Sequence, residues 1–407
     1  MDRNNIKKIN KDKSGESYDF DKIIDRSGSG DLKHEALLPR WRRNDLLPLW
    51  VADMDFETPM FITDALKKRL EHSLFGYTVE PKELWQSIIN WVNEHHQWEL
   101  KREWLKFIPG IVKGIGLIIN VYTKPGDKVI IQPPVYHPFR LTPEGNNREV
   151  VFNPLKLRDD GYYDMDFDNL EKVCDDKCRI FILCNPHNPA GMCWKKETLQ
   201  KLADFCYEHH LLVISDEIHC DMAIFGHKHI PFATVSEKAR ENSITFQAPT
   251  KTFNIAGIIS SYAIIPNSDI RKKFYGWVNA NELDEANIFA PIATIAAFTK
   301  GEEWRKAMLA YIEDNVRFIE DYCEKNIPQI HPLRPQASFL VWLNCRELNL
   351  DHKDLLDLFI DKAHLALNDG EMFGQGGEGF MRMNIATPRS VIKQALDQLA
   401  TAVNNLK

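Results

Sequence analysis

Four side chains that could do chemistry each stand shortly after an apolar run, where a strand would end. They are Tyr136 after Lys128–Gln132, Asn188 after Arg179–Cys184, Asp216 after Leu211–Ser215 and Lys251 after Ser243–Gln247. In an open α/β sheet, ligands bind outside the carboxyl ends of the strands. We therefore expect the aromatic ring, the amide, the carboxylate and the amine to face one common crevice.

These residue types suit an aldehyde cofactor that carries a charged ring nitrogen. Lys251 can form a Schiff base once its amine is neutral, and burial beside a cationic group lowers a lysine's pKa in that sense. Asp216 can hold the ring nitrogen protonated, so that the ring withdraws electrons. Asn188 can donate to a phenolate-like ring oxygen, and Tyr136 can stack on the ring. The set predicts pyridoxal 5′-phosphate as the cofactor.

Each residue also has an ordinary structural interpretation. Taken alone, Lys251 is a surface cation, Asp216 is a helix N-cap, and Asn188 belongs to a turn with two Asn-Pro pairs. The nearby acids Glu217 and Asp221 are alternatives to Asp216, which we prefer because it lies closest to the strand end. The interpretation as a cofactor site therefore depends on the joint placement of the four side chains.

A phosphate group on such a cofactor needs backbone N–H groups at the start of a helix. Pro109–Gly114 precedes the apolar stretch 115–122, which is expected to be helical, so Gly110, Val112 and Lys113 are the candidates.

A second glycine-rich segment, Gly374–Gly379, formally matches the dinucleotide-binding pattern. It follows no strand, and it leads into a strand rather than a helix. Because that pattern needs a strand before it and a helix after it, a nicotinamide cofactor is not predicted.

Arg382 is the candidate for holding a substrate carboxylate, because it lies within the strand-like run Phe380–Ile385. A planar guanidinium binds a carboxylate through two parallel hydrogen bonds. Arg389 is the alternative, but it stands past the strand, in a Thr-Pro-Arg turn.

The bulk composition is that of an ordinary globular enzyme. The 407 residues are 44% apolar and 27% charged, which suits two domains, and the net charge of -7 argues against nucleic acid or an anionic membrane as the main partner. No apolar stretch approaches the ~18 residues of a spanning helix, and the N-terminal segment lacks a signal-peptide core, so we expect a cytoplasmic protein. The eight cysteines show no repeated CxxC pair, so no metal site is expected, and the adjacent pairs His95–His96 and His209–His210 are interpreted as surface histidines.

Short apolar runs alternate with amphipathic stretches from about residue 105 to 265, which predicts an α/β fold with a mostly parallel sheet. The expected strands are 129–131, 180–183, 211–214, 244–246 and 262–265, with 339–343 and 380–385 in a smaller C-terminal part; the expected helices are 59–70, 83–94, 115–122, 197–209, 302–325, 353–362 and 390–404. We expect a disordered extension over 1–17, an N-terminal arm over 18–50 that joins the small domain, a large cofactor-binding domain over 51–290 and a small domain over 291–407.

Several segments carry a family resemblance. Asn185–Gly191, Ser215–Asp221 and Pro249–Gly257, in this order, resemble the fold-type-I pyridoxal-phosphate enzymes of aminotransferase class I/II. Further segments are similar to the cystathionine β-lyase-like C–S lyase subgroup (MalY/PatB type): Trp50–Phe56, Phe75–Tyr77, Asn368–Gly370, Phe373–Gly374 and Gly379–Ala386. The resemblance covers almost everything from Tyr18 onward. It implies the PLP-dependent transferase-like fold, with a large mostly parallel-sheet domain and a smaller α/β C-terminal domain.

The resemblance also implies a role for each of the residues chosen above. Lys251 matches the Schiff-base lysine, Asp216 the partner of the ring nitrogen, and Asn188 the donor to the ring oxygen and a neighbour of the substrate. Tyr136 matches the stacking aromatic, and Arg382 matches the arginine that binds the substrate carboxylate.

Other residues enter through the resemblance alone. Tyr77 corresponds to a tyrosine that reaches the cofactor phosphate of the neighbouring subunit, which implies a homodimer with shared active sites. His219 stands where aminotransferases often have a tyrosine that contacts the ring oxygen, and Ala52 and Asp53 are expected beside the substrate.

The phosphate contacts depart from the aminotransferase pattern. Many aminotransferases carry an arginine eight or nine residues after the lysine, where this chain has Ile259 and Ser260, and Ala248 replaces a common serine. Phosphate binding is therefore expected to use backbone groups and Tyr77, with Ser260 or Lys113 as further contacts.

The resemblance implies β-elimination from cystathionine or a cysteine S-conjugate, a small amino-acid substrate, to give a thiol, pyruvate and ammonia. An aminotransferase is the first alternative, because it uses the same lysine to move the same proton. A regulatory protein that retains the fold is the second.

Overall fold

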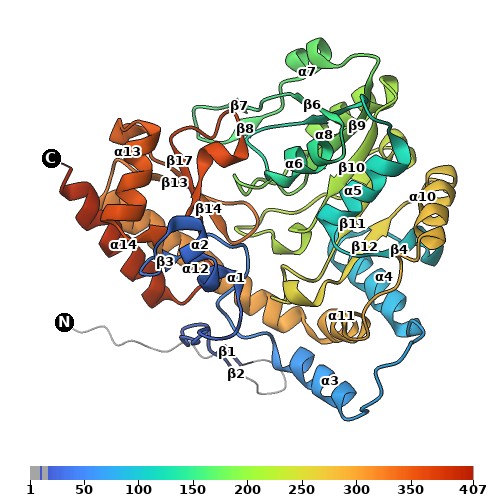
Figure 1. Ribbon diagram of the computed structural model, residues 1–407, viewed down its shortest axis with the longest axis horizontal. Coiled ribbons are helices and arrows are strands. Elements are labelled where there is room, and N and C mark those ends of the chain that lie inside the picture. The colour runs from blue at the N-terminus through green and yellow to red at the C-terminus, as the bar shows by residue number, and fades with distance from the viewer. Residues whose placement is uncertain (1–9, 12–16, 407) are drawn as a thin grey trace.

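A seven-stranded sheet forms the centre of the computed structural model, which describes residues 10, 11 and 17–406 (Figure 1). Its strands, in spatial order, are β4 (Leu105–Ile108), β12 (Ser261–Ile264), β11 (Ser243–Gln247), β10 (Leu212–Asp216), β9 (Cys178–Cys184), β5 (Lys128–Ile131) and β6 (Glu149–Phe152). The strands from β6 to β11 run parallel, whereas β12 is antiparallel to both of its neighbours. The predicted α/β fold with a mostly parallel sheet is confirmed.

Both faces of this sheet are buried, because successive strand residues point to opposite sides. In β9, Ile180 and Ile182 belong to the same core as helix α5 (Ile111–Tyr122). Phe181 and Leu183 join the opposite core, which includes apolar residues of α8 (Lys196–Glu208). A strand buried on both faces needs a continuous apolar run, which is why this strand was predictable.

The C-terminal part contains a second, four-stranded sheet, and its orange and red elements lie to one side of the large sheet in Figure 1. The strand order is β13 (His331–Leu333), β14 (Leu340–Asn344), β17 (Phe380–Asn384) and β16 (Asn368–Asp369), all antiparallel. Its helices are α12 (Glu302–Asn326), α13 (His352–Asp357), which continues into a π-helical turn over Leu358–Lys362, and α14 (Arg389–Asn404).

The N-terminal arm packs against this C-terminal part. It carries α1 (Leu32–Glu35), α2 (Leu37–Trp41) and β3 (Leu47–Pro48), and β3 pairs in parallel with β15 (Leu365–Ala366). The domain boundary at 290/291 stays a prediction, since α11 (Phe289–Lys300) contacts elements on both sides of it, namely α3, α4 and α12. The extension expected over 1–17 lies mostly outside the described residues; β1 (Asn10–Lys11) pairs there with β2 (Ser17–Tyr18).

Some elements were missing from the predicted set or begin elsewhere. The strands β4 and β6 lie at the two sheet edges and are short, and β7 (Lys156–Leu157) and β8 (Tyr163–Asp164) form a separate pair. The additional helices are α1, α2, α6 (Pro138–Gly145), α7 (Phe167–Val173), α9 (Glu237–Glu241), α10 (Ser268–Ala280) and α11. Helices α3 (Met60–Leu70) and α4 (Lys82–His96) match their predicted spans within two residues. Thr58, the expected N-cap of α3, instead donates its hydroxyl to the carbonyl of Asn254.

Within the described residues, no helix combines the length and the apolar character needed to cross a membrane.

Candidate active site

A cavity of about 290 Å³ lies at the carboxyl ends of β9, β10 and β11, and we name it the strand-end cavity. The predicted site residues among those that line it are Ala52, Val112, Lys113, Tyr136, Asn188, Asp216, His219 and Lys251. Residues up to 199 positions apart in the chain therefore meet here, since the Lys251 amine donates to the Ala52 carbonyl. The four strand-end side chains do face a common crevice, as expected.

Lys251 stands four residues after the end of β11, and its Nζ lies 2.5 Å from the carbonyl oxygen of Ala52. Burial lowers the pKa of this amine to about 8, and Arg382 acts in the same direction, whereas Asp53 and Asp216 act against it. A neutral amine is the nucleophilic form and the form that can accept a proton. Lys251 therefore reaches that form closer to neutral pH than an ordinary lysine does.

Asp216 is the last residue of β10, and its carboxylate accepts a hydrogen bond from the backbone N–H of Ile218 at 3.1 Å. Burial raises its pKa to about 7, and a cationic group placed opposite would favour the ionised form again. The alternatives are already engaged: Glu217 takes part in four buried hydrogen bonds, and Asp221 bonds to His96 and Trp91. Of the three acids, only Asp216 lines the strand-end cavity.

The first turn of α5 also borders the cavity. This helix begins at Ile111, four residues earlier than predicted. Gly110 at its N-cap has φ 111°, a backbone conformation that residues other than glycine rarely adopt. The N–H groups of a first helical turn have no acceptor within the helix. Those of Ile111, Val112 and Lys113 are therefore free to bind an anion, which fits a phosphate.

Arg382 lies in the middle of β17, and its buried side chain contacts Asn188. Its two terminal nitrogens donate to the Asn188 side-chain oxygen at 3.0 Å, the Trp50 carbonyl at 3.1 Å and the Asn368 side-chain oxygen at 2.6 Å. All three acceptors are neutral, its Nε has no partner, and burial lowers its pKa to about 10. An enclosed guanidinium without a counter-ion favours an anionic ligand. The alternative, Arg389, instead donates to Asn315 at 2.6 Å.

Three other predicted residues, like Arg382, do not line this cavity within the chain. The Ser260 hydroxyl bonds to Thr294 at 2.6 Å, and its neighbour Ser261 lines the cavity instead. Adjacent residues at a strand start point to opposite sides, which explains the one-residue difference. Asp53 turns its carboxylate toward Arg26 and Lys33. Tyr77 is 103% exposed, on the segment between α3 and α4.

The family model for aminotransferase class I and II matches residues 44–399 of this chain. The chain belongs to that family. It is 40% identical to cystathionine beta-lyase PatB of Bacillus subtilis over 95% of this chain and 100% of that protein, and 32% identical to Protein MalY of Escherichia coli over 96% and 100%. Among solved structures it is similar to cystalysin from Treponema denticola, which contains a pyridoxal 5′-phosphate cofactor, with 36% identity, a TM-score of 0.92 and coverage of 96% and 100%. The expected family and the fold-type-I architecture are thereby confirmed.

In this member of the family, an ion cluster around the buried Lys33 side chain, which sequence reasoning missed, holds the segment beside Lys251. Lys33 has a fully buried side chain, and its Nζ lies 2.9 Å from Asp53 and 2.8 Å from Asp55. Arg26 contacts the same two carboxylates at 2.9 and 2.8 Å. These pairs span 20 to 29 residues across an irregular arm, so no periodicity in the sequence could indicate them.

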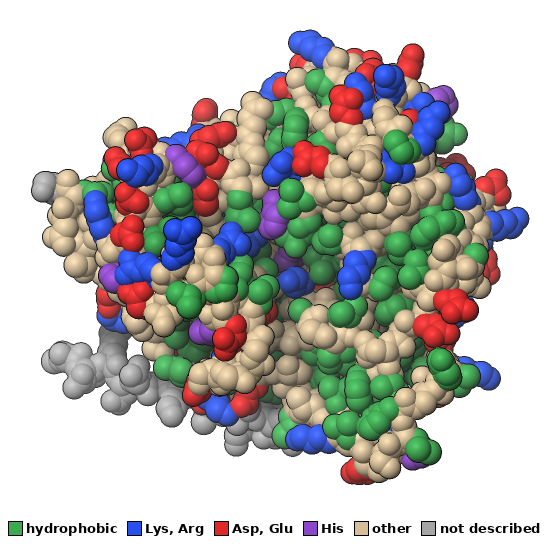
Figure 2. Space-filling view, in the orientation of Figure 1, with side chains coloured by type: hydrophobic (Ala, Val, Ile, Leu, Met, Phe, Trp, Pro, Cys, Tyr) green, Lys and Arg blue, Asp and Glu red, His purple; other side chains and the backbone are tan. Residues whose placement is uncertain are grey.

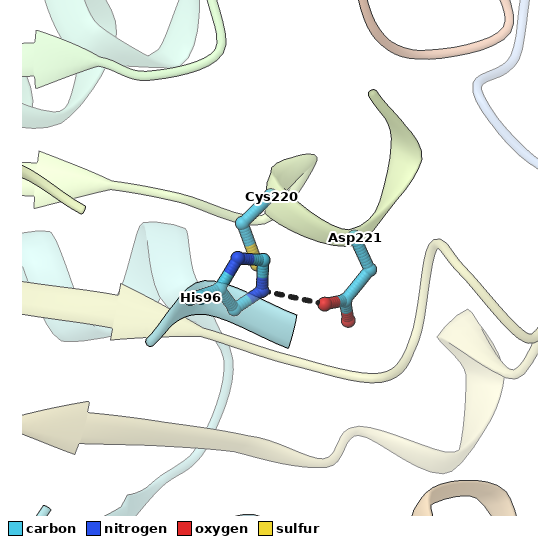
Figure 3. Close-up of side chains that lie close together, drawn as sticks. All are labelled: His96, Cys220 and Asp221. Carbon is cyan, nitrogen blue, oxygen red and sulfur yellow. Dashed lines mark hydrogen bonds and ion pairs between the residues drawn. The ribbon is translucent and has the colours of Figure 1, made fainter. Parts of the chain in front are cut away.

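A second buried group corrects the interpretation of His95 and His96 as surface histidines. His96, Cys220 and Asp221 lie together in Figure 3, and His96 Nε2 is 2.8 Å from Asp221 Oδ1. The side chain of His96 is only 4% exposed, because α4 packs this end of the helix against the 3₁₀ turn Cys220–Met222.

This group is the set of three side chains in the described residues that could hold a metal ion. Asp221 Oδ1 also accepts the indole N–H of Trp91 at 3.0 Å, and burial raises the pKa of the Cys220 thiol well above its ordinary value. The geometry is therefore that of a hydrogen-bonded network between α4 and the turn that follows β10.

Proposed function

We propose that this protein is a pyridoxal-phosphate-dependent carbon–sulfur β-lyase that cleaves cystathionine or a cysteine S-conjugate to a thiol, pyruvate and ammonia. The observation that carries the proposal is the Lys251 amine, with a lowered pKa, in one cavity with Asp216 and next to Arg382. The 40% identity to a cystathionine beta-lyase over 95% of the chain favours elimination over transamination.

The residues around the strand-end cavity fit the cofactor. Asp216 would hold the ring nitrogen, Asn188 and His219 the ring oxygen, and Tyr136 the ring face, while the first turn of α5 would bind the phosphate. Asn188 already uses its side-chain oxygen to accept from Arg382, which leaves its amide N–H free to donate. When bound, the cofactor supplies an aldehyde that captures the substrate amine and a ring that withdraws electrons from the α-carbon.

The protein residues then position the substrate and move its proton. Arg382 binds the α-carboxylate through the enclosed guanidinium, which fixes the amino acid at one end. The neutral Nζ of Lys251 takes the α-proton, and the Ala52 carbonyl orients that nitrogen. Loss of the proton allows the thiolate to leave from the β-carbon, and hydrolysis of the three-carbon remainder gives pyruvate and ammonia.

We also propose a homodimer in which Tyr77 completes the partner's site. The supporting observation is an exposed apolar segment with Leu74 at 69%, Phe75 at 57% and Val79 at 90% exposure around Tyr77. Apolar patches of this kind mark protein interfaces.

A cytoplasmic location is proposed on the eight free cysteines, since thiols persist in a reducing compartment.

The test of this function is an incubation of the cofactor-loaded protein with L-cystathionine and no keto acid. We expect pyruvate and free thiol to appear in equal amounts. Turnover that requires an added keto acid would instead assign transamination, and a protein that binds the cofactor but turns over neither mixture would favour the regulatory alternative.

A further inference from the structure

Arg40 is a second guanidinium without a carboxylate partner, and it lies close to Arg382. It belongs to α2, and its guanidinium carbon lies 4.9 Å from the ring centre of Trp41 and 4.7 Å from that of Trp50. Its Nη2 contacts the sulfur of Met372 at 3.9 Å. Within the described part of the chain, Arg40 forms no ion pair with an acid. Its cation is therefore held in place by rings and a thioether.

One layer of side chains separates Arg40 from the proposed α-carboxylate site. Trp50, which carries the Arg40 guanidinium on its ring, accepts a hydrogen bond from Arg382 through its carbonyl. Met372, which contacts Arg40, accepts a hydrogen bond from Asn368 at 3.3 Å, and Asn368 accepts one from Arg382 at 2.6 Å. Arg40 is thus linked to Arg382 by two short routes, one through Trp50 and one through Met372 and Asn368.

His137 contacts the same aromatic ring as Arg382, that of Phe373. Its ring lies edge-on to Tyr136, with centres 5.2 Å apart, and to Phe373, with centres 6.5 Å apart, and the Phe373 ring also lies 4.9 Å from the guanidinium carbon of Arg382. Its Nδ1 is buried and has no hydrogen-bond partner. Burial lowers the pKa of His137 to about 4, and Arg382, Arg40 and Arg140 lower it further in that order. The imidazole is therefore neutral at physiological pH and can donate one hydrogen bond.

The charged groups near His137 carry a net positive charge. Arg140 is paired with Glu144 at 3.2 Å. Burial lowers the pKa of Arg40, and Asp369 opposes this effect only in part; the Asp369 carboxylate accepts the backbone N–H of Glu371 and lies 3.5 Å from His352. Figure 2 shows a hollow near the centre of this face with Lys or Arg and His side chains around it. Among the described residues, neither Arg40 nor Arg382 forms an ion pair with a carboxylate, so an anion near them would meet cations that are not neutralised.

We propose that Arg40 and His137 form a second anion subsite, which binds a carboxylate on the sulfur side of the substrate. This inference rests on the proposed function, and it narrows the substrates to cysteine thioethers whose leaving thiol carries a carboxylate. Arg382 holds the α-carboxylate, and Arg40 holds the distal one through charge-assisted hydrogen bonds, with His137 as a neutral donor.

Two substrates of equal shape test the subsite: S-(2-carboxyethyl)-L-cysteine and its amide, S-(2-carbamoylethyl)-L-cysteine. We expect the wild-type enzyme to release pyruvate from the acid with a kcat/KM about tenfold above that of the amide. Arg40→Gln is expected to remove this preference by lowering kcat/KM for the acid, with the amide unchanged within about twofold. Arg40→Lys keeps the charge and is expected to retain part of the preference. Arg140→Gln, which changes a nearby but paired arginine, is the matched control.

Equal losses on both substrates in Arg40→Gln would overturn the subsite, because Arg40 would then only support Trp50 and Arg382. An unchanged preference would overturn it as well. If the wild-type enzyme releases pyruvate from neither compound, the L-cystathionine assay decides whether the proposed function fails, and the subsite is judged by binding of the acid and the amide, measured from the cofactor absorbance. Tighter binding of the acid that Arg40→Gln abolishes supports the subsite, and equal binding overturns it.

Discussion

Lys251 depends on its surroundings for the property that makes it useful, which is a pKa near 8. The carbonyl of Ala52 accepts a hydrogen bond from the amine, but an uncharged acceptor does not neutralise the ammonium. Burial therefore penalises the charged form of the amine. Arg382, which has no acid partner, adds to that penalty. Arg382, which favours a substrate anion, thus also prepares the base.

Replacement of Lys251 by alanine is expected to remove the proton acceptor without loss of the fold. We expect kcat for pyruvate release from L-cystathionine to fall by at least about 10³-fold, because general-base catalysis contributes about 10² to 10⁴. The measurement is a coupled pyruvate assay, with Lys196→Ala, an exposed lysine at the start of α8, as the control. Normal turnover by Lys251→Ala would remove this residue from the mechanism.

The lowered pKa predicts a pH dependence in the cofactor-free protein. The Lys251 amine loses its proton as the pH rises through about 8, so its modification by an acylating reagent should be half-maximal there. Lys325 is the internal control, because its hydrogen bond to Asp321 raises its pKa above the ordinary value. Mass spectrometry of the modified peptides at pH 7, 8, 9 and 10 measures both. A Lys251 that labels no earlier than Lys325 would contradict the effect of burial.

At the scale of elements, the site depends on where helices and strands begin and end. The first turn of α5 borders the cavity only because Gly110 takes a backbone conformation with φ 111°. The segment 52–55 lies beside Lys251 because Lys33 and Arg26 bind its two carboxylates. Neither arrangement follows from the pattern of apolar residues, and each can be tested by one substitution.

Gly110→Ala is expected to weaken cofactor binding. A side chain at this φ costs about 1 to 3 kcal/mol, and relief of that strain would turn the N–H groups of the α5 first turn away from the cavity. We expect the Kd of pyridoxal phosphate, from absorbance titration of the cofactor-free protein, to rise about tenfold. Gly116→Ala, within the same helix, has only an ordinary contact at 3.4 Å with Thr142 and should leave the Kd unchanged. Equal Kd values for both variants would argue against the α5 phosphate site.

Lys33→Met is expected to destabilise the protein by about 3 kcal/mol, because it removes a fully buried cation and leaves two partly buried carboxylates with Arg26 as their remaining partner. Urea denaturation at a fixed protein concentration measures the free energy of unfolding. Lys22→Met, which removes the exposed pair with Glu57, should change it by less than about 0.5 kcal/mol. A loss of the same small size in both variants would show that the ion cluster contributes little.

At the scale of the whole molecule, Tyr77 and Lys251 are expected to act together only across a dimer. We predict that a Tyr77→Ala chain and a Lys251→Ala chain, each nearly inactive, regain activity when they are mixed after unfolding. Half of the dimers would then be mixed and would carry one intact site, so about a quarter of the wild-type activity per chain should return. Light scattering should give twice the chain mass of 47.2 kDa. If no activity returns, Tyr77 does not serve the partner's site.

The elements that could be predicted are those with a local signal in the sequence. The strands β5, β9, β10, β11, β12, β14 and β17 were predicted within two residues at each end, since an apolar run is visible in the chain. The edge strand β6 was not predicted, although it contains the short apolar run 150–152, and its residues are exposed or half-buried. The start of α5 was missed because a glycine at an N-cap leaves no polar capping side chain to recognise.

The sequence alone determined which residues stand at strand ends and which family the chain resembles, because both are properties of short segments. It therefore led to Lys251, Asp216, Asn188 and Tyr136. The tertiary structure decided what surrounds them. It separated Asp216 from Glu217 and Asp221 by their hydrogen bonds, buried His96 and Lys33, and joined Arg382 to Trp50 across 332 residues. Such contacts depend on how the whole chain closes on itself, and no local pattern of residue types encodes that closure.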